Sequence, residues 1–435
     1  MHDIHSHILP GIDDGAKTME DSIELCRLAQ ADGVRAIVAT PHIREGVWAN
    51  RRDGIAERLE ELREEQTAAK RTPAYDGLCR DLAADEVERR LAAGEPATLR
   101  FRVPEGETRF TDLVRGEVRF ANHEVDDWIM VRANGSPTYN FVVVCDDAEM
   151  EITHVLRGEE HVTNTPKQLL LYAAMGLEPP RFGHLPLMLG KDGKKLSKRT
   201  GDTALQDYRD KGYPPEAVVN FLALQGWALD GETEVFSTAR MIERFEPEQV
   251  SKGGSIFDPE KFLWMAGEYV RADDVARLAE RCAPFVVRAG LATADELAAR
   301  AAWFRAVVAS EQERFSLYGD LPARIAYLFA EDGDVDYAEK AEAGARKHAA
   351  GLETLAAYAE WLRPRVERGV DAASLRDETK AWIAERGAKM PVLFQPLRCA
   401  LTGHPGGPDL FDVMALLGPE STLARIEHGL VRLAS

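Results

Sequence analysis

The chain has 435 residues, a length that suggests about three domains at roughly 150 residues each. Its 54 Lys and Arg against 73 Asp and Glu give a formal net charge of −19, and 45% of its residues are hydrophobic. This composition excludes a disordered chain and argues against general nucleic-acid binding, while leaving a local basic surface open. Apolar runs such as those at 141–145 and 221–224 are too short to span a bilayer, and no basic segment followed by an apolar one suggests a secretory leader, so we expect no membrane association.

Five cysteines are scattered along the chain without any CxxC pair. Their odd number and wide spacing argue against a disulfide framework and against a four-cysteine zinc site. This usage predicts a reducing compartment, so we expect a cytoplasmic protein. The cysteines are Cys26, Cys79, Cys145, Cys282 and Cys399.

The N-terminal segment predicts a βαβ unit. Residues 3–7 are typical of a short strand, and residues 34–40 of a β-branched strand. Between them, residues 19–32 show apolar side chains near helical spacing, and Thr18 with Asp21 resembles a capping box at the start of that helix.

The rest of the chain predicts mixed structure and then helices. Residues 52–70 are charged helix formers, and residues 72–135 alternate short strands with polar turns, as in an α+β insertion. The apolar run TYNFVVVCD at 138–146 predicts a strand buried on both faces of a parallel sheet. Residues 167–175 predict a helix, and beyond about residue 265 helical periodicity continues to the end.

The strongest chemical signal is a glycine-flanked basic loop, GKDGKKLSKRTGD, at 190–202. Four lysines and one arginine fall within nine positions. Paired cations on such a loop suit the stabilisation of charge that develops on a polyphosphate. The loop is not a P-loop, because GxxxxGK[ST] is absent. A solvated charged turn is the alternative interpretation of the loop taken alone.

The string KLSKR at 195–199 resembles the KMSKS loop of class I aminoacyl-tRNA synthetases, in the form used by glutamyl-tRNA synthetases. Other segments resemble the same family in its order and spacing, and the resemblance extends from about residue 57 to the end. It implies an α/β catalytic domain of Rossmann type with an α+β insertion, followed by an all-α anticodon-binding domain. The segments are PTYNFVVVCDD (137–147), ITHVLRGEEHVTNTPKQLLLYAAMG (152–176), HLPLMLG (184–190), YPPEAVVNFLALQGW (213–227), VSKGGSIFDPEKFLWMAGEYV (250–270) and QPLRCALTG with DLFDVMALLG (395–418).

The resemblance implies roles for individual residues. Lys198 matches the family's ATP-contacting lysine, Lys195 is its companion, and Ser197 lies between them in the catalytic loop. Tyr139 and Arg157 match positions that contact the amino-acid substrate. The chemistry fits, because a guanidinium fork pairs well with a carboxylate and a phenol adds a directional hydrogen bond.

The residues alone leave two other interpretations open. Tyr139 could be a core aromatic at the start of a strand. Arg157 could form a structural salt bridge with Glu159 or Glu160.

The resemblance also implies a reaction. The α-carboxylate of L-glutamate attacks the α-phosphorus of ATP, pyrophosphate leaves, and the adenylate is transferred to the 3′-terminal ribose of tRNA(Glu), with Mg²⁺ as the phosphate partner. We therefore expect L-glutamate, ATP and tRNA(Glu) as partners, and a monomer.

The chain departs from the family's pattern in three places. The HIGH motif, expected after the first Rossmann strand, has no counterpart in the sequence, so we expect an incomplete catalytic domain and a doubtful activity. Ala266 stands where family members usually carry Asn. Some members hold zinc through a set of which only Cys79 remains here, with Asp81 at the His position, so we expect no zinc in the Cys79 region.

A second family resembles the N-terminus. MHDIHSHILPGIDDGAKTMEDS (1–22) with VRAIVATPHIREGVW (34–48) is similar to the opening of metal-dependent PHP-type phosphatases, the bacterial capsule-associated tyrosine phosphatases. His5, His7 and His42 match metal ligands of that family, and imidazoles suit Mn, Fe or Zn. Because the further ligands of a multinuclear site are missing from so short a fragment, we expect a remnant metal site at most.

The junction between the two resemblances leaves two hypotheses open. The segment ERLEELREEQ at 57–66 suits a helix in either family, so a join there suggests recombination or an error in gene assembly. Alternatively, the βαβ unit replaces the first strands of the incomplete sheet, and residues 7–11 echo HIGH in composition.

We therefore expect a glutamate–tRNA ligase fold, α/β followed by all-α. The competing functions are a catalytically dead tRNA-binding remnant and a metal-dependent phosphatase fragment. The expected parts are a phosphatase-like βαβ fragment (1–56), an acceptor-stem-binding insertion (57–135), the second half of the Rossmann domain with the KLSKR loop (136–200), a linking stem-contact subdomain (201–265) and the anticodon-binding helices (266–435).

Overall fold

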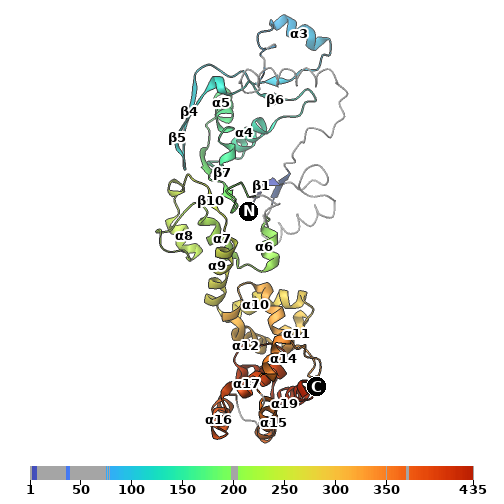
Figure 1. Cartoon of the computed structure of the whole chain (residues 1–435). Helices are drawn as coiled ribbons and strands as arrows, with labels where there is room; N and C mark the ends of the chain where they lie inside the picture. Colours follow the sequence, from blue (N-terminus) through green and yellow to red (C-terminus); the bar gives the residue numbers. More distant parts are fainter. Residues whose placement is uncertain are drawn as a thin grey trace. The chain divides into compact units, whose positions relative to one another are not determined.

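The computed structural model (Figure 1) describes residues 2–6, 36–39, 75, 77, 79–196, 204–348, 350–368 and 372–434. The chain divides into two compact units. The first comprises residues 1–96 and 126–128, and the second comprises residues 97–125 and 129–435. No described helix is both long enough and apolar enough to cross a membrane.

The described strands of the first unit confirm the predicted strand positions at the N-terminus. β1 (His2–Ser6) pairs in parallel with β2 (Ala36–Ala39), with His2 opposite Ala36. Parallel pairing of these strands is what the predicted βαβ order requires. The predicted helices at 19–32 and 52–70 lie outside the described residues, as do His7 and His42.

The first unit also contains the segment around Cys79. Helix α3 (Ala84–Ala92) follows it, and the backbone N–H of Cys79 donates to the phenol oxygen of Tyr75 at 2.7 Å. Arg80 pairs with Asp127 at 2.5 Å, which fastens this segment to residues 126–128 of the same unit.

Short strands and polar turns open the second unit, as predicted for an α+β insertion. Two antiparallel pairs form here, β3 with β6 and β4 with β5, and a parallel pair, β7 with β8, follows. The strands are β3 (Leu99–Arg100), β4 (Glu107–Asp112), β5 (Gly116–Ala121), β6 (Ile129–Val131), β7 (His154–Gly158), β8 (Arg181–Leu185), β9 (Met188–Leu189) and β10 (Ser255–Ile256).

The strand predicted at 138–146 is wrong: these residues belong to helix α4 (Tyr139–Glu149). Thr138 stays extended and the amides of residues 141 and 142 both donate to its carbonyl, which starts the helix. An unbroken apolar run does not distinguish a buried strand from a buried helix by periodicity. The helix predicted at 167–175 is confirmed as α5 (Thr165–Met175), against which α4 packs (Figure 1).

A β-α-β unit built from β7, α5 and β8 carries the chemistry described below. In its parallel register Leu156 lies opposite Gly183 and Arg157 opposite His184. A Cβ at Gly183 would lie 2.6 Å from the side chain of Leu156 and 3.3 Å from that of Leu113. Glycine at this position therefore allows the close approach of β7, β8 and the end of β4.

Helices make up the chain beyond residue 265, as predicted. Separate hydrophobic clusters hold them. One includes Leu278 and Val307, another includes Leu355 and Leu397, and a smaller one includes Ala345. The helices from residue 204 onward are α6 (Leu205–Lys211), α7 (Pro215–Ala223), α8 (Thr238–Arg244), α9 (Pro259–Ala272), α10 (Val275–Arg288), α11 (Ala294–Ala299), α12 (Ala301–Glu311), α13 (Leu321–Ile325), α14 (Glu339–Arg346), α15 (Gly351–Glu367), α16 (Ala372–Glu385), α17 (Met390–Thr402), α18 (Leu410–Leu417) and α19 (Pro419–Ala434).

Local sequence signals set several helix starts. Asp258, Asp274 and Asp409 each accept hydrogen bonds from the first-turn amides of α9, α10 and α18. Thr293 and Glu296 form a reciprocal capping box at α11. Such caps satisfy amides that have no partner within the helix, so the sequence specifies these boundaries locally.

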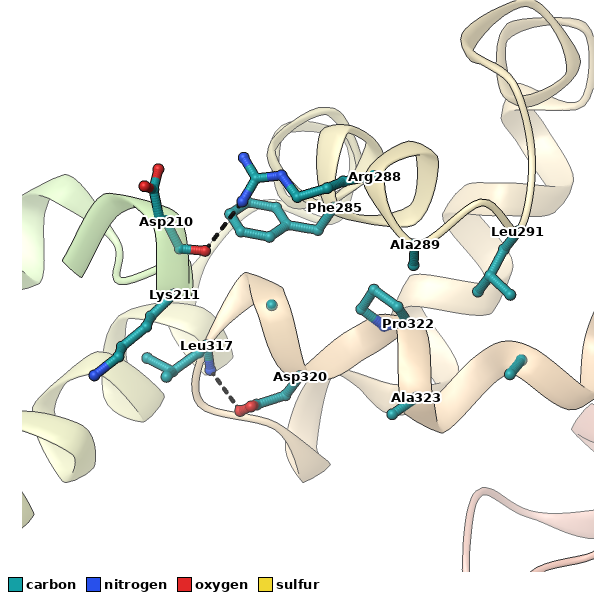
Figure 2. Close-up of a pocket in the computed structure, with 12 residues that line it drawn as sticks. Asp210, Lys211, Phe285, Arg288, Ala289, Leu291, Leu317, Asp320, Pro322 and Ala323 are labelled. Carbon is teal, nitrogen blue, oxygen red and sulfur yellow. Dashed lines mark hydrogen bonds between the residues drawn. The ribbon is translucent and has the colours of Figure 1, made fainter. Parts of the chain in front are cut away.

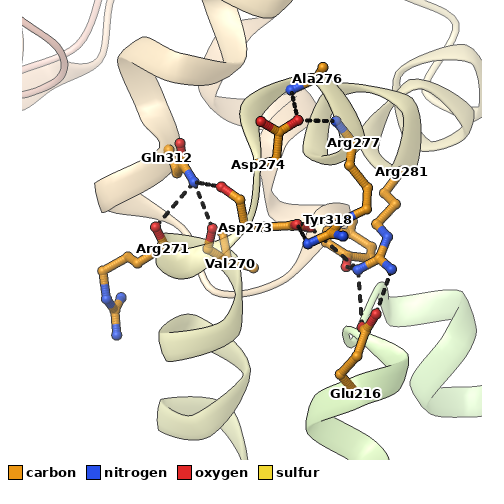
Figure 3. Close-up of polar contacts among 10 residues, drawn as sticks. All are labelled: Glu216, Val270, Arg271, Asp273, Asp274, Ala276, Arg277, Arg281, Gln312 and Tyr318. Carbon is orange, nitrogen blue, oxygen red and sulfur yellow. Dashed lines mark hydrogen bonds and ion pairs between the residues drawn. The ribbon is translucent and has the colours of Figure 1, made fainter. Parts of the chain in front are cut away.

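A polar joint connects α7 to α10 (Figure 3). Arg281 donates from both terminal nitrogens to Glu216, at 3.0 and 2.6 Å, and donates to the phenol of Tyr318 at 3.0 Å. The pairing with Glu216 raises the pKa of Arg281. Because the two helices come from different parts of the fold, this two-pronged contact couples the α7 segment to the start of the helical part.

The C-terminal end of α9 is held by a second contact at the same joint (Figure 3). The side-chain amide nitrogen of Gln312 lies 2.9 Å from the carbonyl oxygens of Val270 and Asp273, and 3.2 Å from that of Arg271. Carbonyls at the end of a helix have few intrahelical donors, so the Gln312 amide supplies hydrogen bonds that the end of α9 needs. Helix α9 runs through residues 265 and 266, so the boundary expected there falls within one continuous helix.

Arg425 of α19 is the largest fully buried side chain of the helical part, with 2% of its surface exposed. Its guanidinium donates to Asp332 at 2.8 Å and to three backbone carbonyls. The carbonyls belong to Tyr327, Ala330 and Leu401, at 2.8, 2.8 and 3.0 Å. One side chain thus ties the C-terminal helix to two other chain segments.

Replacement of Arg425 by Met removes this charge and leaves Asp332 and the three carbonyls without their donor. We expect the free energy of unfolding to fall by about 3–5 kcal/mol, because one partner of a buried ion pair is lost. Urea unfolding followed by far-UV circular dichroism measures this loss. Arg363→Met, which breaks the exposed pair with Glu427, is the matched control and should cost about 1 kcal/mol or less. Equal losses in the two variants would contradict the assignment.

Candidate functional site

Arg157 lies near the end of β7, and three side chains hold its guanidinium. Nε donates to Nε2 of His184 at 3.1 Å, and Nη2 donates to Oγ1 of Thr165 and to Oε1 of Gln168, both at 2.8 Å. The guanidinium also lies 5.4 Å from the ring centroid of Phe182. Two of its three nitrogens are therefore committed to protein atoms of the β7-α5-β8 unit.

The alternative of a structural salt bridge from Arg157 to a neighbouring glutamate is wrong. Glu159 pairs with Arg115, and Glu160 pairs with Nζ of Lys195 at 2.8 Å. The two acidic residues that follow β7 belong to the short helix η2 (Glu159–His161), and both pair with cations other than Arg157.

Burial lowers the pKa of Arg157, and Tyr139, Asp147 and Asp112 act against this effect. A guanidinium stays charged in proteins, so the site contains a partly buried permanent cation. Burial also raises the pKa of Asp147, against the attraction of the same guanidinium. A partly desolvated Arg is the group that pairs most strongly with an incoming carboxylate.

Behind Arg157 lies a buried hydrogen-bonded pair, Asp112 and His184, both with fully buried side chains. Oδ2 of Asp112 and Nδ1 of His184 are 2.5 Å apart. Burial on its own would raise the pKa of Asp112, but the hydrogen bond from His184 and those from three backbone amides lower it to about 2. The carboxylate is therefore ionised throughout the physiological range.

Tyr139 is the first residue of α4 and is 45% exposed. The alternative of a core aromatic at the start of a strand is therefore wrong. Its ring lies 6.0 Å from the ring of His161, and Oδ1 of the next residue, Asn140, accepts a hydrogen bond from Gln168 at 3.1 Å. The start of α4 thus faces the same β7-α5-β8 unit that holds Arg157.

The basic loop begins as a tight hairpin. The amide of Gly190 donates to the carbonyl of Lys194 at 2.8 Å, and the amide of Leu196 donates to that of Met188 at 3.0 Å. Gly193 has a φ of +72°, which favours glycine in this turn. The side chain of Lys195 emerges from the hairpin and reaches Glu160.

Glu160 anchors the base of the loop electrostatically. The hydrogen bond from Lys195 lowers the pKa of Glu160. Because Glu160 lies three residues after Arg157, the ion pair between Glu160 and Lys195 brings Lys195 toward Arg157, the candidate for binding the substrate. Ser197 and Lys198 lie outside the described residues.

Sequence reasoning missed the three residues that hold Arg157, namely Thr165, Gln168 and His184, and also Asp112, which holds His184. Thr165 and Gln168 are three residues apart at the start of α5, and His184 is a polar residue in the apolar strand β8. A buried polar residue needs a partner, so the histidine in HLPLMLG was a usable signal. The sequence gives no comparable signal for Asp112, the carboxylate partner of this histidine, which lies 72 residues away.

One cavity lies beside the loop, and another lies among helices α6, α10 and α13. One of about 520 Å³ is lined by Gly190, Lys191, Asp192 and Leu196 of the loop and by aromatic side chains including Phe262. The other, of about 680 Å³, has no sequence-predicted site residue in its lining (Figure 2). There Arg288 donates to the carbonyl of Asp210 at 3.2 Å, and the amide of Leu317 donates to Asp320 at 3.1 Å.

Within the described ranges, no group of three or more His, Cys, Asp or Glu residues is arranged to hold a metal ion. Cys79 is exposed. His5 lies in β1, while its two predicted companion ligands fall outside those ranges. The N-terminal metal site stays a prediction.

Replacement of Asp112 by Asn tests the electrostatics of the buried pair. Because the pKa of Asp112 is lowered from 3.8 to about 2, its ionisation stabilises the fold above pH about 4, and this contribution is lost as the pH falls toward 2. A shift of that size corresponds to about 2 kcal/mol. We expect the variant to be less stable by about this amount at pH 7, with the difference disappearing toward pH 2.

Chemical unfolding of both proteins at several pH values, followed by tryptophan fluorescence, measures the difference. Asp192→Asn, at an exposed turn of the loop, is the control and should leave the pH profile unchanged. A stability difference for Asp112→Asn that does not vary with pH would show that the carboxylate is not ionised in the folded protein.

Comparisons with known proteins agree on one family. A family model described as the catalytic domain of class I tRNA synthetases (E and Q) matches residues 38–264, and an anticodon-binding-domain model matches residues 277–430. The glutamate–tRNA ligase of Geobacillus stearothermophilus is 41% identical over 380 residues, which cover 86% of this chain and 76% of the relative. That of Clostridioides difficile is 38% identical over 86% of this chain and 75% of its own.

Solved structures give the same result. The crystal structure of a glutamate tRNA ligase from Elizabethkingia meningosepticum, in complex with its amino acid, superposes with a TM-score of 0.75 at 25% identity, covering 96% of this chain and 90% of that one. A glutamate-tRNA synthetase from Elizabethkingia anophelis gives a TM-score of 0.70 at 28% identity, over 86% of this chain and 78% of that one. The catalytic match, the anticodon-binding match and the relatives together show that this chain belongs to the glutamate–tRNA ligase family of class I tRNA synthetases.

Proposed function

We propose that this chain binds L-glutamate, ATP and tRNA(Glu) and that its site is built for the ligation of the amino acid to the tRNA. The observation that carries the proposal is the position of Arg157. Its guanidinium is partly desolvated and held on one side by His184, Thr165 and Gln168, in a chain whose relatives are glutamate–tRNA ligases. A cation held in this way is suited to a carboxylate of the substrate.

Each named residue has a part in the proposed reaction. Arg157 and Tyr139 bind the amino acid. As an α-carboxylate oxygen of glutamate bonds to the α-phosphorus of ATP, the bond to pyrophosphate breaks, and Lys195, Ser197 and Lys198 stabilise the charge on the phosphates. The ribose hydroxyl of the tRNA then displaces AMP from the adenylate carbonyl. Magnesium supplies a Lewis acid that neutralises the ATP phosphates.

The loop hairpin supports this assignment of the lysines. Its turn at Gly193 and its ion pair between Lys195 and Glu160 fix where the basic segment leaves the sheet. Positioning of this kind is the main source of rate in phosphoryl and adenylyl transfer.

Several finer points belong to the same proposal. We propose the domain boundaries given above, a monomer and a cytoplasmic location. We propose no zinc at the Cys79 region.

A second candidate function is tRNA binding without ligation. The observation that favours it is the sequence, which contains no HIGH tetrapeptide among its 435 residues. The match to an anticodon-binding domain at residues 277–430 is independent of that motif. A chain that retains these helices could bind tRNA with salt-dependent affinity and perform no chemistry.

Pyrophosphate exchange separates the two candidates. With tRNA(Glu) present, we expect exchange that depends on both glutamate and ATP. Lys198→Ala should lower its rate about 10²–10³-fold, because one cation that stabilises the developing charge is lost. Lys194→Ala, at a neighbouring lysine of the same loop, is the control and should stay near the wild-type rate. Absence of exchange from folded protein that still shifts tRNA in a gel would contradict ligation and support the tRNA-binding candidate.

Arg157→Lys tests the amino-acid subsite. The substitution keeps the charge but removes the planar fork and its hydrogen bonds to His184 and Thr165. We expect the KM for glutamate to rise about tenfold or more, while the KM for ATP stays unchanged. A change in the KM for ATP alone would assign Arg157 to the other substrate.

A further inference from the structure

We propose that Asp112 and His184 form a buried positioning pair that sets the orientation of the Arg157 guanidinium for the substrate carboxylate. This inference rests on the proposed function of Arg157 as the glutamate-binding cation. Neither residue touches the substrate; both act through Arg157.

The first step is the fixing of the Asp112 carboxylate. Its Oδ1 accepts backbone hydrogen bonds from Val114 at 3.0 Å, Arg115 at 2.9 Å and His184 at 3.2 Å. Its Oδ2 is 2.5 Å from Nδ1 of His184. The turn after β4 and the strand β8 therefore hold the carboxylate from two directions, and one oxygen is reserved for the imidazole.

The second step is the choice of tautomer at His184. An ionised carboxylate only accepts hydrogen bonds, so Nδ1 must carry the proton. On the other side of the ring, Nε of Arg157 lies 3.1 Å from Nε2 and only donates, so Nε2 must be an acceptor. Thr165 Oγ1, also 3.1 Å from Nε2, is a second possible donor. The two sides of the ring independently require the same neutral tautomer, which is assigned from these partners.

The third step is the restraint on the ring itself. His184 is fully buried, and its ring lies 6.4 Å from the rings of both Phe110 and Phe182, stacked on the latter at 10°. Rotation of the imidazole would break its bond to Asp112 and move it against these rings. The position of Nε2 is thereby fixed.

The last step is geometric. A guanidinium is planar, so fixing two of its nitrogens fixes the direction of the third. His184 holds Nε, while Thr165 and Gln168 hold Nη2. The direction of Nη1 then follows. The phenol of Tyr139 also hydrogen-bonds the Arg157 side chain, so the two residues proposed to bind the amino acid are in contact with each other. The register of β7 and β8, in which Arg157 lies opposite His184, places this chain of contacts on one sheet face.

Three variants of the full chain test the pair. Asp112→Asn keeps the size of the side chain and its backbone acceptor, but presents an N–H to Nδ1 of His184. This favours the other tautomer, which turns Nε2 into a donor facing the donor Nε of Arg157. In His184→Asn the side chain ends at the level of Nδ1, so the hydrogen bond from Nε of Arg157 is lost. His184→Gln places an amide oxygen at the level of Nε2, where it can still accept from Arg157.

Glutamate and ATP affinities are measured by titration calorimetry with the full chain and tRNA(Glu). We expect Asp112→Asn and His184→Asn to weaken glutamate binding about tenfold to a hundredfold, the range for a hydrogen bond to a charged group. His184→Gln should retain most of the glutamate affinity. ATP affinity and the tRNA gel shift should stay unchanged in all three.

The tautomer is read separately, without substrate, by ¹⁵N NMR of imidazole-labelled protein, with the His184 signals identified by their loss in His184→Gln. We expect the Nδ1–H form in the wild type and the Nε2–H form in Asp112→Asn.

Equal glutamate affinity in Asp112→Asn and wild type would overturn the inference, as would an Nε2–H tautomer in the wild type. Loss of ATP, tRNA and glutamate binding together in all three variants would assign the pair a purely structural role and overturn it too. Failure of the proposed function looks different: the wild type itself would not bind glutamate, whatever the tautomer of His184.

Discussion

The parallel pairing of β7 with β8 is the constraint on which the site depends. It places Arg157 directly opposite His184, and it requires a glycine at position 183 because the side chains of Leu156 and Leu113 occupy the space of a Cβ. The amide of Leu113 donates to the carbonyl of Phe182 at 2.8 Å, so the end of β4 is fastened to the same strand. Asp112 is the residue immediately before Leu113. Backbone pairing thus places the carboxylate of Asp112, the imidazole of His184 and the guanidinium of Arg157 in one chain of hydrogen bonds.

The helical part uses buried polar groups in a comparable way. Arg281 and Glu216 fasten α10 to α7, and Arg425 fastens α19 to the backbone of two earlier segments. A buried donor left without a partner is costly, so these directional bonds favour the packing in which each group is satisfied. The helices that match an anticodon-binding domain are therefore connected to the catalytic side by specific contacts within one unit.

The sequence predicted the features that depend on local signals or on family likeness. The two N-terminal strands, the helix at 167–175, the short strands of the insertion and the helical second half follow from periodicity, while the role of Arg157 is a prediction from a quoted motif. The run at 138–146 was assigned to a strand because apolar residues without alternation fit both structures, and only the packing of α4 on α5 decides between them. The partnership of Asp112 with His184 spans 72 residues and depends on strand register, which no local pattern reveals.

The central claim is that a chain of this family without a HIGH tetrapeptide still carries a glutamate-specific site. Charging of tRNA(Glu) with radiolabelled glutamate tests it most directly, because acid-precipitable label requires glutamate, ATP and tRNA to meet in one site. We expect ATP-dependent label on tRNA(Glu) that is lost in Lys198→Ala. No label above background, from protein that is folded and binds the tRNA, would contradict it.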